Sequence, residues 1–173
     1  MGPNGLVHDQ FGMINIAVDF YKKLFAKDSR EDFTLQSDFW DTDGLVTEAE
    51  NSLLTAPFSE EEIKDAVFNS YAEGAPGPDG LSFLFYQKFW GVVKHDLVKL
   101  FDDFYSGNLD LHRLNFAMIS LIPKVAEAKD MKNFRPISLI NCSFKIFSKV
   151  LTSRLARVAD RLVDTNQSAF YQG

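Results

Sequence analysis

Two short apolar runs of this sequence each lie beside a cation, and these two cations are the side chains best suited to chemistry on a charged ligand. Lys124 follows Leu121-Ile122-Pro123, and Arg135 lies within Asn133-Phe134-Arg135-Pro136. A guanidinium donates two parallel hydrogen bonds to a phosphate or carboxylate, and an adjacent proline restricts the backbone. The pattern therefore indicates an anion-binding site at Lys124 and Arg135.

A rigid element must hold these cations, and the surrounding sequence predicts a β-hairpin. Residues 116–123 are apolar and partly β-branched, residues 125–132 form a charged tip, and residues 134–139 supply the returning strand. We expect Lys124 and Arg135 near the open, cationic end of this hairpin.

A basic helix follows the hairpin, from about Cys142 to Val163, with Asn141 as its cap. Its period predicts a buried face made of Phe144, Phe147, Leu151, Leu155, Val158 and Leu162. The cations Lys145, Lys149, Arg154, Arg157 and Arg161 are expected on the remaining surface. Such a helix suits a polyanion, but an ordinary solvated face fits the same pattern.

The sequence before the hairpin predicts mainly helices. An amphipathic helix is predicted from about Asp9 to Ala26, with Phe11, Ile14, Ala17, Val18, Tyr21 and Phe25 on its apolar face. Residues 27–46 read as a loop that includes a turn at 41–44, and residues 48–54 as a short helix.

Three further signals organise the middle of the chain. Ser59 and Glu62 form a capping-box pattern that starts a helix ending near Ala72. Residues 73–80 hold two prolines and three glycines and predict turns. A long helix is expected over residues 81–105, with a break near Gly91 and a closing glycine at Gly107. Together with the hairpin, these elements predict a mostly α-helical α+β fold.

Composition limits the class of protein. The chain has 173 residues, 46% of them hydrophobic, and can bury a core; it has no apolar run of membrane-spanning length, so no membrane partner is expected. The single cysteine, Cys142, excludes an internal disulfide and predicts a buried thiol. Residues 1–110 carry 8 Lys and Arg against 20 Asp and Glu, whereas residues 111–173 carry 10 against 4. This asymmetry suggests either a polyanion-facing C-terminal third or a basic helix docked on an acidic one.

Five sequence blocks occur in an order found in one family. They are Ala75-Pro76-Gly77-Pro78-Asp79-Gly80, Leu121-Ile122-Pro123-Lys124, Asn133-Phe134-Arg135-Pro136-Ile137-Ser138-Leu139, Lys145-Ile146 with Lys149 and Arg154-Leu155, and Gln167-x-x-Phe170-x-x-Gly173. The chain resembles the N-terminal portion of reverse transcriptases of LINE-type (non-LTR) retrotransposons, and its sequence motifs are most similar to those of plant elements. Residues 1–73 resemble the helical segment that precedes the polymerase motifs, and residues 74–173 a partial reverse transcriptase domain.

The resemblance implies the fingers and palm entrance of a right-hand polymerase, an incomplete domain that works on an RNA template, a DNA primer and deoxynucleotide triphosphates. Lys124 and Arg135 match the residues expected to bind the triphosphate. The remaining positions border the template–primer path or lead into the palm: Lys145, Lys149, Arg154, Arg157, Gln167 and Phe170.

The family's Mg²⁺-binding aspartates, expected later than Gly173, do not occur in this sequence, and Phe101-Asp102-Asp103 is expected on a helix rather than in a strand turn. We therefore expect no catalytic or metal-binding residue here and an inactive fragment, inside the cell in the nucleus or cytoplasm. A non-catalytic RNA- or DNA-binding module and a pseudogene product are the alternatives.

Overall fold

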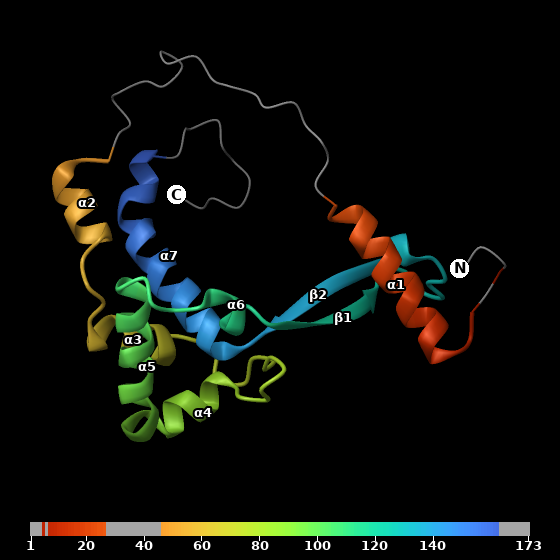
Figure 1. Ribbon diagram of the computed structural model, residues 1–173, viewed down its shortest axis with the longest axis horizontal. Helices are drawn as coiled ribbons and strands as arrows, with labels where there is room; N and C mark the ends of the chain where they lie inside the picture. Colours follow the sequence, from red (N-terminus) through yellow and green to blue (C-terminus); the bar gives the residue numbers. More distant parts are fainter. Residues whose placement is uncertain (1–4, 6, 27–45, 163–173) are drawn as a thin grey trace, which may run out of the picture. The chain divides into compact units, whose positions relative to one another are not determined.

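The computed structural model describes residues 5, 7–26 and 46–162 (Figure 1). The chain forms two compact units, each assembled from separate stretches of sequence. The described part of unit 1 comprises residues 5, 7–26 and 119–138, and that of unit 2 comprises residues 46–118 and 139–162. The division at residue 73 follows family motifs rather than contacts, and it stays a prediction.

In unit 1 a single helix packs on the loop end of the hairpin. Helix α1 spans Gln10–Leu24 and is capped by the Asp9 carboxylate, which accepts a hydrogen bond from the Gly12 N–H at 2.7 Å. The helix is confirmed, but its predicted buried face is wrong. Tyr21 is buried, whereas Phe11, Ile14 and the other large side chains of that stripe are exposed. Within the described residues, α1 contacts mainly the short 3-10 turn η2, Met131–Asn133, which is too small to cover the stripe.

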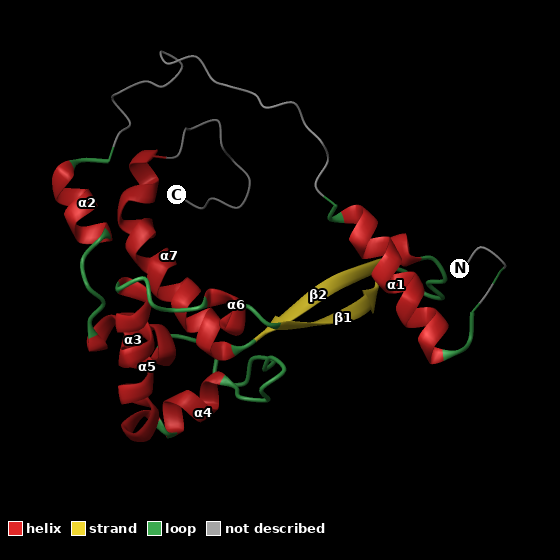
Figure 2. Cartoon of the chain, in the orientation of Figure 1, coloured by secondary structure: helices red, strands yellow, loops and turns green. Residues whose placement is uncertain are grey.

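The predicted hairpin is confirmed as a two-stranded sheet of β1, Ala117–Pro123, and β2, Phe134–Ile140 (Figure 2). The Lys124 N–H donates to the Asn133 carbonyl at 2.8 Å, just where the loop closes. Lys124 and Arg135 therefore lie at the closed, loop end of the hairpin, and the expectation of an open end was wrong. The reason is that the charged tip, residues 125–132, is itself the loop joining the strands.

Unit 2 is helical. Its helices are α2, Glu48–Leu54; α3, Glu60–Phe68; α4, Phe83–Lys88; α5, Trp90–Tyr105; α6, Leu111–Leu114; and α7, Cys142–Leu162. The chain is thus mostly helical with one hairpin, in agreement with the expected α+β class. None of the described helices is both long and apolar enough to cross a membrane.

Local sequence signals placed several helix ends correctly. The predicted capping box of Ser59 and Glu62 is confirmed, and a second one, which was not predicted, joins Thr47 and Glu50 at the start of α2. The expected break in the long helix is present at Phe89, slightly before Gly91. Gly107, with a φ of 72°, ends α5 by donating to the Phe104 carbonyl while Asn108 donates to Asp103. Helix α3 ends at Phe68, earlier than the predicted Ala72.

The core of unit 2 joins α3, α4, α5 and α7. Its fully buried side chains are Phe101, Ile63, Ile146, Val67, Val150 and Cys142. The rings of Phe101 and Phe147 stack with centroids 4.0 Å apart and tie α5 to α7. Burial raises the pKa of the Cys142 thiol, as expected for a cysteine that packs as a small hydrophobe. Asp102 and Asp103 lie on α5, as predicted, and Asp103 pairs with Lys99.

Helix α7 buries a different face from the predicted one. Phe147 and Val158 are buried as expected, but Leu155 and Leu162 are exposed. The buried row instead contains Cys142, Ile146, Phe147, Val150, Arg154 and Val158. Because α7 carries apolar residues on two faces, its periodicity alone could not show which face meets the core.

The turn-rich segment before α4 packs against the start of α7. The Asn141 side-chain oxygen accepts a hydrogen bond from the Asp79 N–H at 3.2 Å, and its carbonyl accepts the Lys145 N–H at 3.2 Å. Gly77 is buried here, and a Cβ at this position would overlap the Asn141 nitrogen and the Ile140 carbonyl carbon. Residue 77 must therefore be glycine for the segment to approach α7 this closely.

Gly77→Ala is expected to lower the free energy of unfolding by about 1–3 kcal/mol, because the backbone must shift to admit a methyl group. Gly91→Ala is the matched control, since a Cβ there meets nothing within 4 Å and lies within α5. It should stabilise the protein by about 0.5–1 kcal/mol. Urea unfolding of both variants measures the difference, and equal effects would contradict this description of Gly77.

Candidate nucleic-acid interface

Asn141, just before α7, and two lysines of α7 contact the segment between α3 and α4, and their contacts run in the reverse order along that segment. Asn141 meets Asp79; the Lys145 ammonium donates to the Ala75 carbonyl at 2.8 Å; and the Lys149 ammonium donates to the Asn69 carbonyl at 2.5 Å and to the Ser70 hydroxyl at 3.0 Å. Asn69 is the C-cap of α3, so Lys149 places a positive charge at the negative end of that helix. These contacts hold the first half of α7 against the C-terminal end of α3 and the turn segment.

Arg154 makes the most extensive contacts of the row. Its guanidinium donates at 2.9 and 2.8 Å to the two oxygens of Glu62. It also donates to three carbonyls of the α2–α3 connection, those of Leu54, Ala56 and Pro57. An arginine has five N–H donors, so all of them are used. The guanidinium carbon lies 4.1 Å from the centre of the Phe58 ring, which adds a cation–π contact.

Glu62 serves two elements at once. Its carboxylate accepts from the Ser59 N–H at 3.1 Å as part of the α3 capping box and also receives Arg154. The hydrogen bond from Arg154 lowers the pKa of the Glu62 carboxyl to about 2, from an ordinary value of 4.5, against the opposing effect of burial. The carboxylate therefore stays charged at any pH near neutrality.

These contacts change the interpretation of the basic helix. Arg154 was expected on the solvated surface, but it is 4% exposed and belongs to the buried row. Lys145 and Lys149 are half-buried and bonded to carbonyls. Part of the positive charge of α7 thus holds an acidic helix, which is the second of the two explanations that the charge asymmetry allowed.

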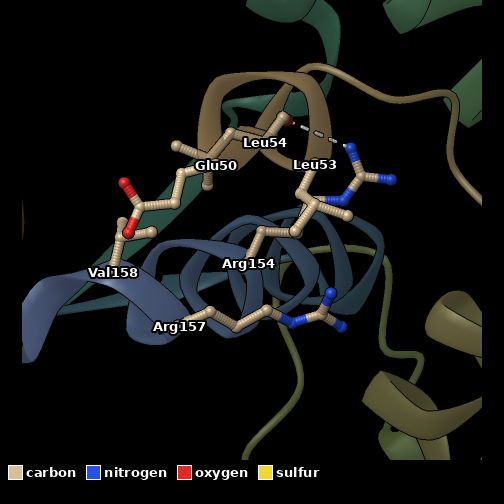
Figure 3. Close-up of a pocket in the computed structure, with 6 residues that line it drawn as sticks. All are labelled: Glu50, Leu53, Leu54, Arg154, Arg157 and Val158. Atoms are coloured by element: carbon tan, nitrogen blue, oxygen red, sulfur yellow. Dashed lines mark hydrogen bonds between the residues drawn. The ribbon is translucent and has the colours of Figure 1, made fainter. Parts of the chain in front are cut away.

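Arg157 remains exposed on α7. It lines a cleft between α3 and α7 with Lys149 and Ser153 of its own helix. It also lines a small pocket beneath α2, where Leu53, Leu54 and Val158 are apolar neighbours. Figure 3 shows Arg154 and Arg157 leaving α7 close together, with Arg154 bonded to the Leu54 carbonyl. Arg157 can therefore meet a ligand, whereas Arg154 supports the surface from within.

In unit 1 the hairpin places Lys124 and Arg135 on one face. The equal strand lengths and the Lys124–Asn133 bond pair Ile122 with Arg135, so Lys124 and Arg135 are diagonal neighbours. Both side chains are exposed. The Lys124 ammonium donates to the Lys132 carbonyl at 2.8 Å, and the Arg135 guanidinium has no hydrogen-bond or ion-pair partner among the described residues. Two neighbouring cations with donors to spare can bind a phosphate-bearing anion.

Gln167 and Phe170 lie outside the described residues. In the described stretches, no group of three His, Cys, Asp or Glu side chains could hold a metal ion. Asp102 and Asp103 do not fit a Mg²⁺ site either, because Asp103 is paired with Lys99 on a helix.

Sequence reasoning missed the Arg154–Glu62 pair and three polar residues of the α3–α7 cleft, Asp65, Asn69 and Ser153. The capping box did identify Glu62, but nothing local indicated a second partner 92 residues away.

Comparison with known proteins gives relatives from transposable elements. The chain is 31% identical over 153 residues, 88% of its length, to an uncharacterized 149 kDa protein of transposon TX1 from Xenopus laevis. It is 30% identical over 118 residues, 68% of its length, to the retrovirus-related Pol polyprotein from the type-1 retrotransposable element R2 of Nasonia vitripennis. The chain is distantly related to proteins of non-LTR retrotransposons.

The match covers a small part of each relative. The retrotransposon-related chain spans 12% of the length of the TX1 protein and 11% of that of the R2 polyprotein. No family model matches the chain.

Arg154→Ala should lower the free energy of unfolding by about 2–4 kcal/mol, because it leaves a part-buried carboxylate and three carbonyls without their donor. Arg157→Ala, one helical turn away and exposed, should change it by less than about 0.5 kcal/mol. Chemical unfolding of the two variants provides the comparison. Equal losses would show that the Arg154 contacts carry no special weight.

The low pKa of Glu62 predicts an acid-dependent loss of stability. Since the pKa is lower in the folded than in the unfolded chain, the contribution is complete above pH 4.5 and is lost as the pH falls towards 2. Allowing for solvent screening at this part-exposed carboxylate, it is on the order of 1–2 kcal/mol. Unfolding measured across this range should show a smaller acid dependence in Glu62→Gln than in the parent. An unchanged dependence in Glu62→Gln would contradict the assignment.

Proposed function

We propose that this chain is the fingers and palm-entrance part of an RNA-directed DNA polymerase, a reverse transcriptase, of a non-LTR retroelement. The observation that carries the proposal is the exposed pair Lys124 and Arg135 on one hairpin face, in a chain related to a Pol polyprotein. The ordered motifs of residues 74–173 support it, and a plant origin of the element is part of the same proposal.

In this proposal Arg135 binds the triphosphate of the incoming deoxynucleotide, and Lys124 neutralises part of its charge. Phosphoryl transfer depends chiefly on positioning and charge stabilisation, and a guanidinium that can donate two parallel bonds supplies both. Arg135 suits this role because none of the described residues bonds to its guanidinium.

Helix α7 then borders the path of the RNA template and DNA primer. Arg157 is exposed, and the Lys145 and Lys149 ammonium groups retain donors beyond their contacts with carbonyls. Arg154 is buried and does not contact the nucleic acid in this proposal; it holds α7 in place through its bonds to Glu62 and to backbone carbonyls. Gln167 and Phe170, the block that leads into the palm, are assigned to the same path from the family pattern.

The proposed chemistry requires carboxylates that bind Mg²⁺, and these 173 residues contain neither of the family's two aspartate blocks. We therefore expect the 173 residues alone to bind nucleotide without extending a primer, with Mg²⁺ held by other carboxylates of the intact enzyme.

Arg135→Ala should weaken the binding of a deoxynucleotide triphosphate about tenfold or more, because it removes a charge-assisted, two-pronged contact. Lys99→Ala is the control: it also removes one exposed cation, but from α5. Equilibrium binding of a fluorescent triphosphate measures both. Equal affinities for the two variants would contradict the proposed site.

A primer-extension assay on an RNA template with Mg²⁺ tests the expected inactivity separately. Extension by the purified 173-residue chain would overturn that part of the proposal while leaving the nucleotide site intact.

A further inference from the structure

The cleft between α3 and α7 has two chemically different walls. Helix α7 contributes Lys149, Ser153 and Arg157, which are four residues apart and so share one face. The facing wall of α3 and its C-cap contributes Glu62, Asp65, Ala66 and Asn69. One wall is thus cationic with a hydroxyl group, and the other carries carboxylates and an amide.

Several polar groups of this cleft are not used by the fold. Glu62 is occupied by Arg154, and Lys149 is bonded to Asn69 and Ser70. In contrast, the side chains of Asp65, Asn69 and Ser153 have no hydrogen-bond partner among the described residues. Asp65, Asn69 and Arg157 are exposed, so a ligand can reach both walls.

The two different walls restrict the chemical class of ligand that this cleft can bind. A phosphate alone would be attracted by Arg157 but repelled by Asp65 on the opposite wall. A ligand with an anionic group at one end and hydrogen-bond donors at the other satisfies both walls. A nucleotide with an amino-bearing base has this arrangement, because its phosphate is anionic and its base edge donates.

We propose that the α3–α7 cleft binds one nucleotide of single-stranded RNA and selects its base. The phosphate lies against Arg157 and Ser153, and the base edge meets Asp65 and Asn69. This inference rests on the proposed function, in which a nucleic-acid strand lies along α7. It adds selectivity for the base to a surface that was expected to bind only the phosphates.

The wall residues indicate which bases are favoured. A carboxylate accepts a hydrogen bond from the cytosine amino group, and an amide pairs with the adenine edge. Uracil has a carbonyl in place of that amino group, so its base edge offers Asp65 only the N3–H, flanked by two acceptors that the carboxylate repels. The cleft should therefore prefer cytosine and adenine to uracil.

The test is fluorescence anisotropy with cytosine-only, adenine-only and uracil-only RNA strands of about eight nucleotides, a length within the usual site sizes. The chain should bind the cytosine strand about fivefold or more tighter than the uracil strand, the lower end for one base contact. Asp65→Ala should weaken cytosine binding and leave uracil binding unchanged or stronger, so the preference disappears. Arg157→Ala should weaken all three strands together, and Lys99→Ala should keep the cytosine preference.

The outcomes separate this inference from the function on which it rests. If no strand binds at low salt, the proposed nucleic-acid surface fails, and this inference fails with it. If all strands bind but without a base preference, only the base-reading cleft is overturned. A gain in affinity for every strand in Asp65→Ala would likewise overturn it, because that would show simple repulsion of phosphate. Thermal melting of each variant confirms that these exposed substitutions leave the fold intact.

Discussion

The Arg154 guanidinium is the constraint on which unit 2 depends. A buried cation is tolerated only when its donors are satisfied and its charge is paired. Here the five acceptor contacts come from Glu62 and from the carbonyls between α2 and α3. The connection between these helices must therefore take a shape that presents its carbonyls to α7. In return, α7 is held at a fixed rotation about its axis, which determines what its other side chains can reach.

The cations proposed for nucleic-acid or nucleotide binding in α7 and the hairpin fall into two sets. Arg154, Lys149 and Lys145 bind backbone carbonyls and an acidic helix, and thereby hold the fold together. Arg157 on α7 and the hairpin pair Lys124 and Arg135 stay exposed. A count of positive charges in the C-terminal third therefore overstates what is available to a polyanion. The exposed cations, together with the spare donors of Lys145 and Lys149, are those that the proposed polymerase function needs.

Local chemistry explains how much of the fold could be predicted. The Ser59–Glu62 capping box, the helix at Glu48–Leu54 and the hairpin depend on neighbours in sequence, and all were predictable. The buried face of α7 was not, because Leu155 and Val158 present apolar side chains on different sides and only tertiary contacts choose between them. The same limit applies to the exposed stripe of α1.

The candidate sites show this limit again. Two short motifs were enough to propose Lys124 and Arg135 as a pair, since a hairpin brings residues 11 positions apart onto one face, but the end of the hairpin was predicted wrongly. Predicting the structural role of Arg154 would have required knowing that it contacts Glu62 and three backbone carbonyls about 100 residues earlier in the chain. A long-range contact of this kind leaves no periodic signal in the sequence. Arg154 could therefore not be distinguished from the other basic residues of α7.

The division between structural and available cations can be measured through the salt dependence of RNA binding. The logarithm of the binding constant should fall linearly with the logarithm of the salt concentration, because bound cations release counterions from the phosphates. Arg157→Ala should lower the magnitude of this slope by about 0.7, the value for one lost contact to a single strand. Lys99→Ala should leave the slope unchanged. An unchanged slope in Arg157→Ala would contradict the assignment of Arg157 to the nucleic-acid surface.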